Sequence, residues 1–126
     1  MNLSIISYEH LSDQKHYIFN LNIQYKDWSS TIQKRYSEFL ELHRVMKVVQ
    51  KNTGADLPSF PKKKKIKQFL RLFTEQDIES RRAALENYMR QLESGDIAKH
   101  SKYFVDFIGL PMRYREDWLM LKSAIY

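Results

Sequence analysis

Cysteine is absent from this chain of 126 residues, and glycine and proline occur three times each. The absence of cysteine excludes disulfide bonds, thiolate chemistry and zinc sites built on cysteine. Three scattered glycines exclude a glycine-rich phosphate loop and a dinucleotide-binding fingerprint. No stretch approaches the roughly 18 uncharged apolar residues of a transmembrane helix, and the first residues lack the basic start and apolar stretch of a signal peptide. We therefore expect a soluble protein that is not exported.

Patterns of catalytic or metal-binding residues are also missing. The four histidines are scattered along the chain, at His10, His16, His43 and His100. No metal-ligand spacing connects them, and no nucleophile lies beside an evident base. The sequence therefore predicts no enzyme, no cofactor and no metal site.

The content of apolar residues limits the domain organisation. Hydrophobic residues make up 43% of the chain and aromatic residues 13%. This is enough for one compact domain with its own core, whereas two independent domains would each be too small.

Positive charge is concentrated in one segment. Residues 62–72, KKKKIKQFLRL, hold five lysines and one arginine but no acid, which equals the net charge of +6 of the whole chain. Large apolar side chains are mixed with these basic ones and follow them directly, at Ile66, Phe69, Leu70, Leu72 and Phe73. Such a mixture fits an anionic membrane with an apolar interior better than it fits an RNA or DNA backbone.

The first third of the chain has the period of β-strands. Large apolar side chains alternate with mostly polar ones over residues 17–25, which predicts a half-buried strand. Residues 28–35 continue the pattern after a tight polar turn, and residues 2–8 offer a third strand. We therefore expect three antiparallel strands before the first helix.

Helical spacing begins after the strands. Ser37 is the expected N-cap of a first helix and Gly54 its stop, and the predicted buried face is Phe39, Leu42, Met46 and Val49. A second helix is expected from about Glu75 to Ser94, with Gly95 as its stop and a buried face of Ile78, Leu85, Tyr88, Met89 and Leu92. Shorter helical patterns cover residues 99–108 and 113–123.

A proline-containing segment separates the two long helices. Residues 55–61 read ADLPSFP, and Pro58 and Pro61 restrict the backbone and remove two N–H donors. The segment is therefore expected to be an extended, polyproline-like crossing. The pattern as a whole predicts an α+β fold.

Three motifs, in this order, resemble the PX (phox-homology) phosphoinositide-binding domain of sorting nexins and related trafficking proteins. They are KRYSEF at residues 34–39, LPSFPKK at 57–63 and RRAALENY at 81–88. The resemblance covers roughly residues 5–111. It implies a three-stranded antiparallel sheet packed on a helical subdomain. Between them it implies a groove that holds a phosphoinositide head group, most often that of phosphatidylinositol 3-phosphate.

The motif match implies roles for four residues. Arg35 matches the arginine that holds the 3-phosphate, and Tyr36 matches the tyrosine that lies against the inositol ring. Arg81, seven residues before Tyr88, matches the arginine that reaches the 4- and 5-hydroxyls.

The fourth matching residue is a lysine after the proline segment. Lys63 matches the lysine that meets the 1-phosphate, and Lys62 or Lys64 would take this role if the alignment shifts by one.

The chemistry of these residue types suits the implied roles. Arg35 precedes a helix N-terminus, so its guanidinium and free backbone N–H groups can converge on one phosphate, with the Ser37 hydroxyl as a further donor. An aromatic face such as that of Tyr36 can cover the C–H groups of an inositol ring. The planar donors of Arg81 suit two adjacent hydroxyls better than a lysine would. For the other nearby aromatic residues we predict packing roles, at Phe39, Tyr88, Phe104 and Phe107.

The basic segment is the expected membrane contact. Its predicted contact residues are Lys62, Lys64, Lys65, Ile66, Phe69 and Leu70, because Ile66, Phe69, Leu70 and Phe73 keep the spacing of an amphipathic turn. The same spacing would also suit a buried protein face, and the pattern leaves both readings open. Six basic residues contribute at most about 6 kcal/mol at an anionic surface, near a dissociation constant of tens of micromolar. Selectivity must therefore come from the pocket rather than from this charge.

Other functions use the same residues. Nucleic-acid binding is disfavoured because most aromatic residues fall on core periods and no stacking motif occurs. Residues 61–67, PKKKKIK, look like a short basic nuclear-import signal, a pattern with a high false-positive rate. The main alternative is a PX-like protein-interaction scaffold with weak or no lipid selectivity, which would use Pro58–Pro61 or the C-terminal helix.

Residues 112–126 lie beyond the PX-like residues 1–111 and form an extra C-terminal helical extension in this interpretation. Their apolar stripe is Tyr114, Trp118, Leu121 and Ile125. It could fold back on the domain, lead into a further part, or form a partner or dimer contact. The function expected from the sequence is a non-enzymatic, cytoplasmic module. It would bind phosphoinositide-containing endosomal or vacuolar membranes peripherally and would take part in protein transport.

Overall fold

The computed structural model of the protein describes residues 1–11, 16–62 and 74–119. Three strands form one antiparallel sheet in the order β1, β2, β3, with β1 at Asn2–His10, β2 at Tyr17–Tyr25 and β3 at Trp28–Arg35. The turn between β2 and β3 places Lys26 in the left-handed region, at φ 54°. The predicted strands are confirmed, and β1 runs two residues further than expected.

Helix α1 (Tyr36–Thr53) follows β3 without a linker. The expectation that Ser37 caps this helix is wrong, because Arg35 is the N-cap. Arg35 keeps the extended backbone of the strand, at φ −87° and ψ 159°, and its N–H donates to the Glu38 carboxylate at 3.0 Å. The strand therefore turns into the helix at Arg35, and Ser37 lies within the first turn. The C-terminal stop is as predicted, with Gly54 in the left-handed conformation at φ 74°.

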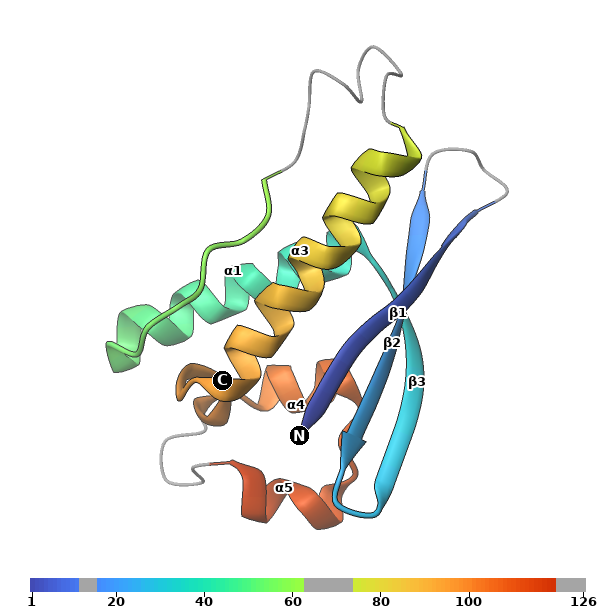
Figure 1. Ribbon diagram of the computed structural model, residues 1–126. Helices are drawn as coiled ribbons and strands as arrows, with labels where there is room; N and C mark the ends of the chain where they lie inside the picture. Colours follow the sequence, from blue (N-terminus) through green and yellow to red (C-terminus); the bar gives the residue numbers. More distant parts are fainter. Residues whose placement is uncertain (12–15, 63–73, 120–126) are drawn as a thin grey trace.

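The core lies between the sheet and the helices. Helix α3 (Glu75–Ser94) and α1 both contribute the buried faces predicted from their spacing. These faces meet the inner side chains of the sheet, which are Leu3, Ile5, Phe19, Leu21 and Ile23. Figure 1 shows α3 running alongside β1, with α1 crossing behind it. This packing confirms the α+β architecture, and Phe39, Tyr88, Phe104 and Phe107 are core residues as expected.

The outer edge of β1 is joined to α3 by side chains. Glu86 accepts the Ile5 N–H at 2.9 Å, and Arg82 donates to the Ile5 carbonyl at 2.7 Å. One turn further along, Arg90 donates to the Leu3 carbonyl at 2.8 Å. These polar contacts take the place of a neighbouring strand, so α3 is held in register with the sheet.

The segment after α3 differs in detail from the prediction. Instead of one helix over residues 99–108, a 3₁₀ turn, η1 (Ile97–His100), is followed by α4 (Lys102–Ile108). The break lies at Ser101, which has an extended backbone and caps α4 by accepting the Phe104 N–H at 3.2 Å. A buried serine that competes for the backbone in this way ends one helical piece and begins the next.

The C-terminal segment folds back on the domain. Helix α5 (Met112–Trp118) is shorter than predicted, because Leu119 already has an extended backbone and residues 120–126 lie outside the described residues. The Trp118 ring stacks on Phe104 with centroids 5.2 Å apart, and Tyr114 meets Tyr25 edge to face at 5.7 Å. Both residues of the predicted stripe that the structure describes are therefore buried against the domain.

Among the helices of the described residues, none has the length and apolar character needed to cross a bilayer. The same part of the chain contains no cluster of histidine and carboxylate side chains that could hold a metal ion.

Candidate functional site

The first part of the candidate site is the junction of β3 and α1. Arg35 ends the strand and its side chain is exposed, whereas Tyr36 is the first residue of the helix and is half-buried. Glu38 holds the junction together by accepting the Arg35 N–H and by pairing with Lys34, whose Nζ lies 3.7 Å from its carboxylate. Ser37 is exposed in the first turn of α1. The N-terminus of an 18-residue helix thus opens beside an exposed guanidinium.

Arg81 comes from α3, 45 residues further along the chain, and meets Tyr36. Its guanidinium carbon lies 4.3 Å from the centroid of the Tyr36 ring. Burial lowers the pKa of Arg81, while the nearby Tyr36 and Asp77 act in the opposite direction. Burial raises the pKa of Tyr36, because it disfavours the charged phenolate, and the charge of Arg81 opposes this shift. The two predicted site residues therefore form a cation–π pair that is partly shielded from water.

The proline loop, residues 54–62, is tied to the same tyrosine. The Tyr36 hydroxyl donates a hydrogen bond to the Pro61 carbonyl at 2.8 Å, and the Tyr36 and Phe60 rings lie 5.6 Å apart. Lys62, the next residue, is exposed. Tyr36 thus contacts an arginine from α3 and also fixes the end of the loop from which the basic segment begins.

Beneath the loop lies an aromatic cluster. Phe60 stacks on the His43 ring, with centroids 4.9 Å apart and planes 20° apart, and meets Tyr88 edge to face at 5.0 Å. The His43 Nδ1 atom lies 2.8 Å from the Tyr88 hydroxyl. Tyr88 is 1% exposed and His43 is 9% exposed. The loop is therefore seated on side chains from both long helices.

The other predicted contact residues belong to the basic segment after Lys62. Lys63, proposed for the 1-phosphate, lies outside the described residues. So do the membrane-contact residues Lys64, Lys65, Ile66, Phe69 and Leu70.

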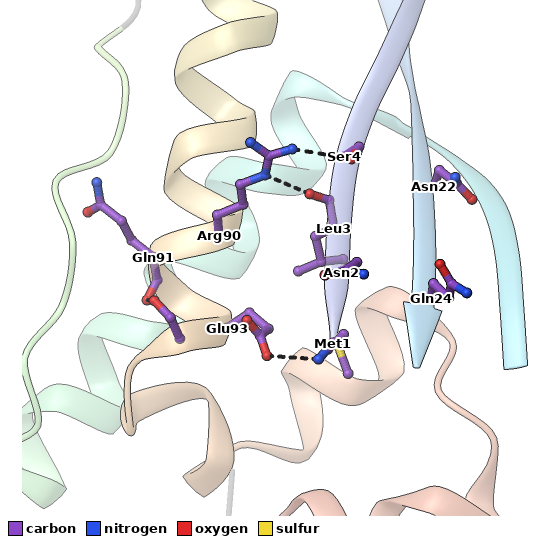
Figure 2. A pocket seen from close by; sticks show the side chains of 10 residues that line it. Met1, Asn2, Leu3, Ser4, Asn22, Gln24, Arg90, Gln91 and Glu93 are labelled. Atoms are coloured by element: carbon purple, nitrogen blue, oxygen red, sulfur yellow. Dashed lines mark hydrogen bonds and ion pairs between the residues drawn. The ribbon is translucent and has the colours of Figure 1, made fainter. Parts of the chain in front are cut away.

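A groove of about 600 Å³ elsewhere on the molecule is not part of this site. It lies between the start of β1 and the end of α3 (Figure 2), and Arg90 is the basic side chain in its lining. Arg90 is held there by the Leu3 carbonyl and the Ser4 hydroxyl, and the acidic Glu93 lies in the same groove. The groove thus holds two engaged cations, the Arg90 guanidinium and the Met1 ammonium, which lies 3.5 Å from the Glu93 carboxylate, and this is a poor match for a phosphorylated head group.

Comparison with known proteins identifies the family. The PX domain family profile matches residues 24–110, which is more than half of the chain. The chain belongs to the PX domain family. The solved structure described as "X-ray structure of a designed CISK-PX domain" is similar to it, with a TM-score of 0.70 and 28% sequence identity. The match covers 85% of this chain and 97% of that one. A search of curated proteins finds no match.

PX domains are lipid-binding modules rather than enzymes, so this PX domain is a phosphoinositide-binding membrane module. The fold brings together Tyr36 and Arg81, two of the residues predicted from the motif match, from distant parts of the chain. Sequence reasoning missed the roles of His43 and Phe60. A signal was present for His43, because it lies four residues after Phe39 on the buried face of α1.

Proposed function

We propose that this PX domain binds the head group of phosphatidylinositol 3-phosphate and thereby recruits the protein to endosomal or vacuolar membranes. The observation that carries this proposal is the contact of Arg81 with Tyr36, next to the exposed Arg35. An arginine from α3 lies over an aromatic ring, and a second, exposed arginine directly precedes that aromatic residue, which is an arrangement suited to a phosphorylated polyol.

Arg35 is the proposed ligand of the 3-phosphate. It lies at the N-terminus of α1, where the first backbone N–H groups lack helical acceptors and the helix dipole favours an anion. The Ser37 hydroxyl in the first turn is a further donor in this proposal. Among the residues that the structure describes, the Arg35 side chain forms no ion pair, in contrast to Lys34 beside it.

Tyr36 and Arg81 are proposed to bind the inositol ring. Tyr36 supplies apolar contact, and Arg81 donates to the 4- and 5-hydroxyls. Because Arg81 is partly buried against Tyr36, a phosphate at either of these positions would crowd it, and this favours the monophosphate.

The basic segment completes the proposal. Lys63 is the proposed ligand of the 1-phosphate, and Lys62, Lys64 and Lys65 are proposed to face the anionic leaflet. Ile66, Phe69 and Leu70 are proposed to contact its apolar interior. Support comes from the bond between Tyr36 and Pro61, which fixes the start of this segment beside the site.

We propose no protein-binding role for the C-terminal helix, because its apolar side chains Tyr114 and Trp118 are buried against the domain. Residues 1–111 are proposed to form the lipid-binding module, with residues 112–126 as its C-terminal extension. Residues 112–119 of this extension contribute to the core.

The test is flotation with vesicles of phosphatidylcholine that carry one phosphoinositide isomer at a time. The expected result is preferential binding of phosphatidylinositol 3-phosphate, weakened at least about tenfold by Arg35→Ala because one charge-assisted phosphate contact is lost. Arg113→Ala is the matched control, since it removes the same charge from α5, at the other end of the domain from the start of α3 (Figure 1). Equal binding of all isomers, unchanged by Arg35→Ala, would overturn the proposal.

A further inference from the structure

His43 has an unusual position for a titratable side chain. It is 9% exposed, and it lies under Phe60 at the point where the proline loop crosses between α1 and α3. One ring face stacks on Phe60, and Nδ1 meets the Tyr88 hydroxyl at 2.8 Å. The imidazole is thus part of the surface on which the loop rests.

This surface is connected to the lipid site by direct contacts. Phe60 touches Tyr36, and the next residue, Pro61, accepts the hydrogen bond of the Tyr36 hydroxyl. The same tyrosine ring carries Arg81, whose guanidinium carbon lies 4.3 Å from the ring centroid. A displacement of Phe60 from His43 therefore moves the loop end and the tyrosine that the inositol ring is proposed to contact.

The surroundings of His43 favour its neutral form. The group from α3 is the Tyr88 hydroxyl, the loop contributes the uncharged Phe60, and Lys47 follows one turn along α1. Tyr36, which carries Arg81, packs on Phe60, and η1, which also packs on α1, carries Lys99 and His100. Among these groups the structure places no carboxylate against the ring, and a protonated imidazole would have two N–H donors to satisfy where Tyr88 offers one oxygen.

The direction of the proton linkage follows from this. Burial lowers the pKa of His43, and the charge of Lys47 acts in the same direction. When Phe60 leaves, water reaches the imidazole and its pKa returns toward about 6.5. The docked arrangement binds fewer protons than the released one, so docking is fully favoured above about pH 6.5 and is weakened as the pH falls below it.

We propose that His43 is a positioning residue that holds the proline loop in its lipid-binding arrangement while the imidazole is neutral, so that mild acid weakens phosphoinositide binding. The inference deepens the proposed function and rests on it, because it concerns the loop whose Pro61 carbonyl accepts the hydrogen bond of Tyr36, the residue proposed to contact the inositol ring.

The first measurement is vesicle binding by the full chain at about pH 7.5 and 5.5, with phosphatidylcholine vesicles that carry phosphatidylinositol 3-phosphate. An ordinary histidine is about nine-tenths protonated at the lower pH, so the linkage can weaken binding by at most about tenfold. The lipid phosphate also titrates, with a second pKa near 6, so the wild-type profile must be compared with those of variants. His43→Phe keeps an aromatic ring under Phe60 but cannot be protonated. Between the two pH values, we expect the affinity of this variant to fall by a factor at least twofold smaller than that of the wild type.

The control is His100→Phe. His100 is a second partly buried histidine, and its Nδ1 has no hydrogen-bond partner, so an apolar ring is tolerated there. This variant should keep the wild-type pH profile. Equal pH profiles for all three proteins would refute the inference.

A second measurement avoids dependence on the folding of a variant. NMR titration of the wild-type histidines should give a lower pKa for His43 with inositol 1,3-bisphosphate bound than without it, because linkage is reciprocal. In the free protein, signals of residues 55–62 should shift together with the His43 titration. An unchanged His43 pKa, or loop signals that ignore it, would also refute the inference. Failure of the proposed function would look different, because isomer preference would be missing at pH 7.5 while the free protein still showed the coupled titration.

Discussion

The Arg81 guanidinium lies over the Tyr36 ring at 4.3 Å, although α3 and the β3–α1 junction are far apart in the sequence. The next arginine, Arg82, points elsewhere and is bound by Glu79 and the Ile5 carbonyl. Two adjacent arginines therefore have separate tasks. Arg82 joins the helix to the sheet, whereas Arg81 lies over the Tyr36 ring.

Two substitutions of Arg81 distinguish the contribution of its charge to lipid binding from that of its planar guanidinium. Arg81→Ala should weaken binding to vesicles with phosphatidylinositol 3-phosphate by about tenfold or more, because it removes charged donors from a partly buried site. Arg81→Lys should recover less than half of this loss in free energy, since an ammonium neither stacks on Tyr36 nor presents planar donors. Flotation at fixed salt measures both. Full recovery by lysine would show that Arg81 acts as a charge alone.

The Tyr36 hydroxyl gives a second test. Tyr36→Phe keeps the ring that Arg81 covers but removes the donor to the Pro61 carbonyl. Loss of this hydrogen bond should cost about 1 kcal/mol, seen as a roughly fivefold weaker binding of the same vesicles with little change in isomer preference. Tyr25→Phe is the control, because Tyr25 lies at the end of β2 that is far from the pairing with Arg35. An unchanged affinity for Tyr36→Phe would mean that the loop does not need this bond.

Much of this fold can be predicted from the sequence because apolar residues recur with the period of a strand or a helix. The strand alternation of β2, the apolar faces of α1 and α3, and the stop at Gly54 all follow from local spacing and backbone preference. The motifs predict Tyr36 and Arg81 as site residues, and their contact follows once the fold is known.

The remaining features depend on contacts between distant segments, which a single sequence does not show. Ser37 stands in a pattern that indicates an N-cap. However, β3 runs directly into α1, and Arg35 is therefore the N-cap. The stacking of Phe60 on His43 joins a loop to a helix; the spacing of α1 indicates that His43 is buried, but no local pattern indicates that Phe60 covers it. The stripe of Tyr114 and Trp118 predicts a buried face without telling what covers it.

The link between α3 and the edge of β1 predicts a stability effect. Glu86→Ala should lower the free energy of unfolding by about 1 to 3 kcal/mol, because the buried Ile5 N–H loses its acceptor. Glu86→Gln keeps a carbonyl oxygen in the same place and should recover much of the loss. The exposed Glu41, paired with Arg44 on α1, is the control, and Glu41→Ala should change stability by less than about 0.5 kcal/mol. Urea denaturation measures all three, and equal effects at the two glutamates would contradict a role of Glu86 at the sheet edge.

Trp118 tests whether the C-terminal helix belongs to the domain. It is 6% exposed and stacks on Phe104 with planes 16° apart, and Lys26 in the β2–β3 turn holds the same helix through Asp117 at 2.7 Å. Trp118→Ala should therefore destabilise the protein by about 3 to 5 kcal/mol, the usual cost of removing a large buried aromatic ring. Binding of vesicles with phosphatidylinositol 3-phosphate should be unchanged in conditions where the variant is folded, because α5 lies away from the start of α1 (Figure 1). Thermal unfolding followed by circular dichroism measures the first effect and flotation the second. A variant of wild-type stability that fails to bind would assign the helix to the membrane site instead of to the core.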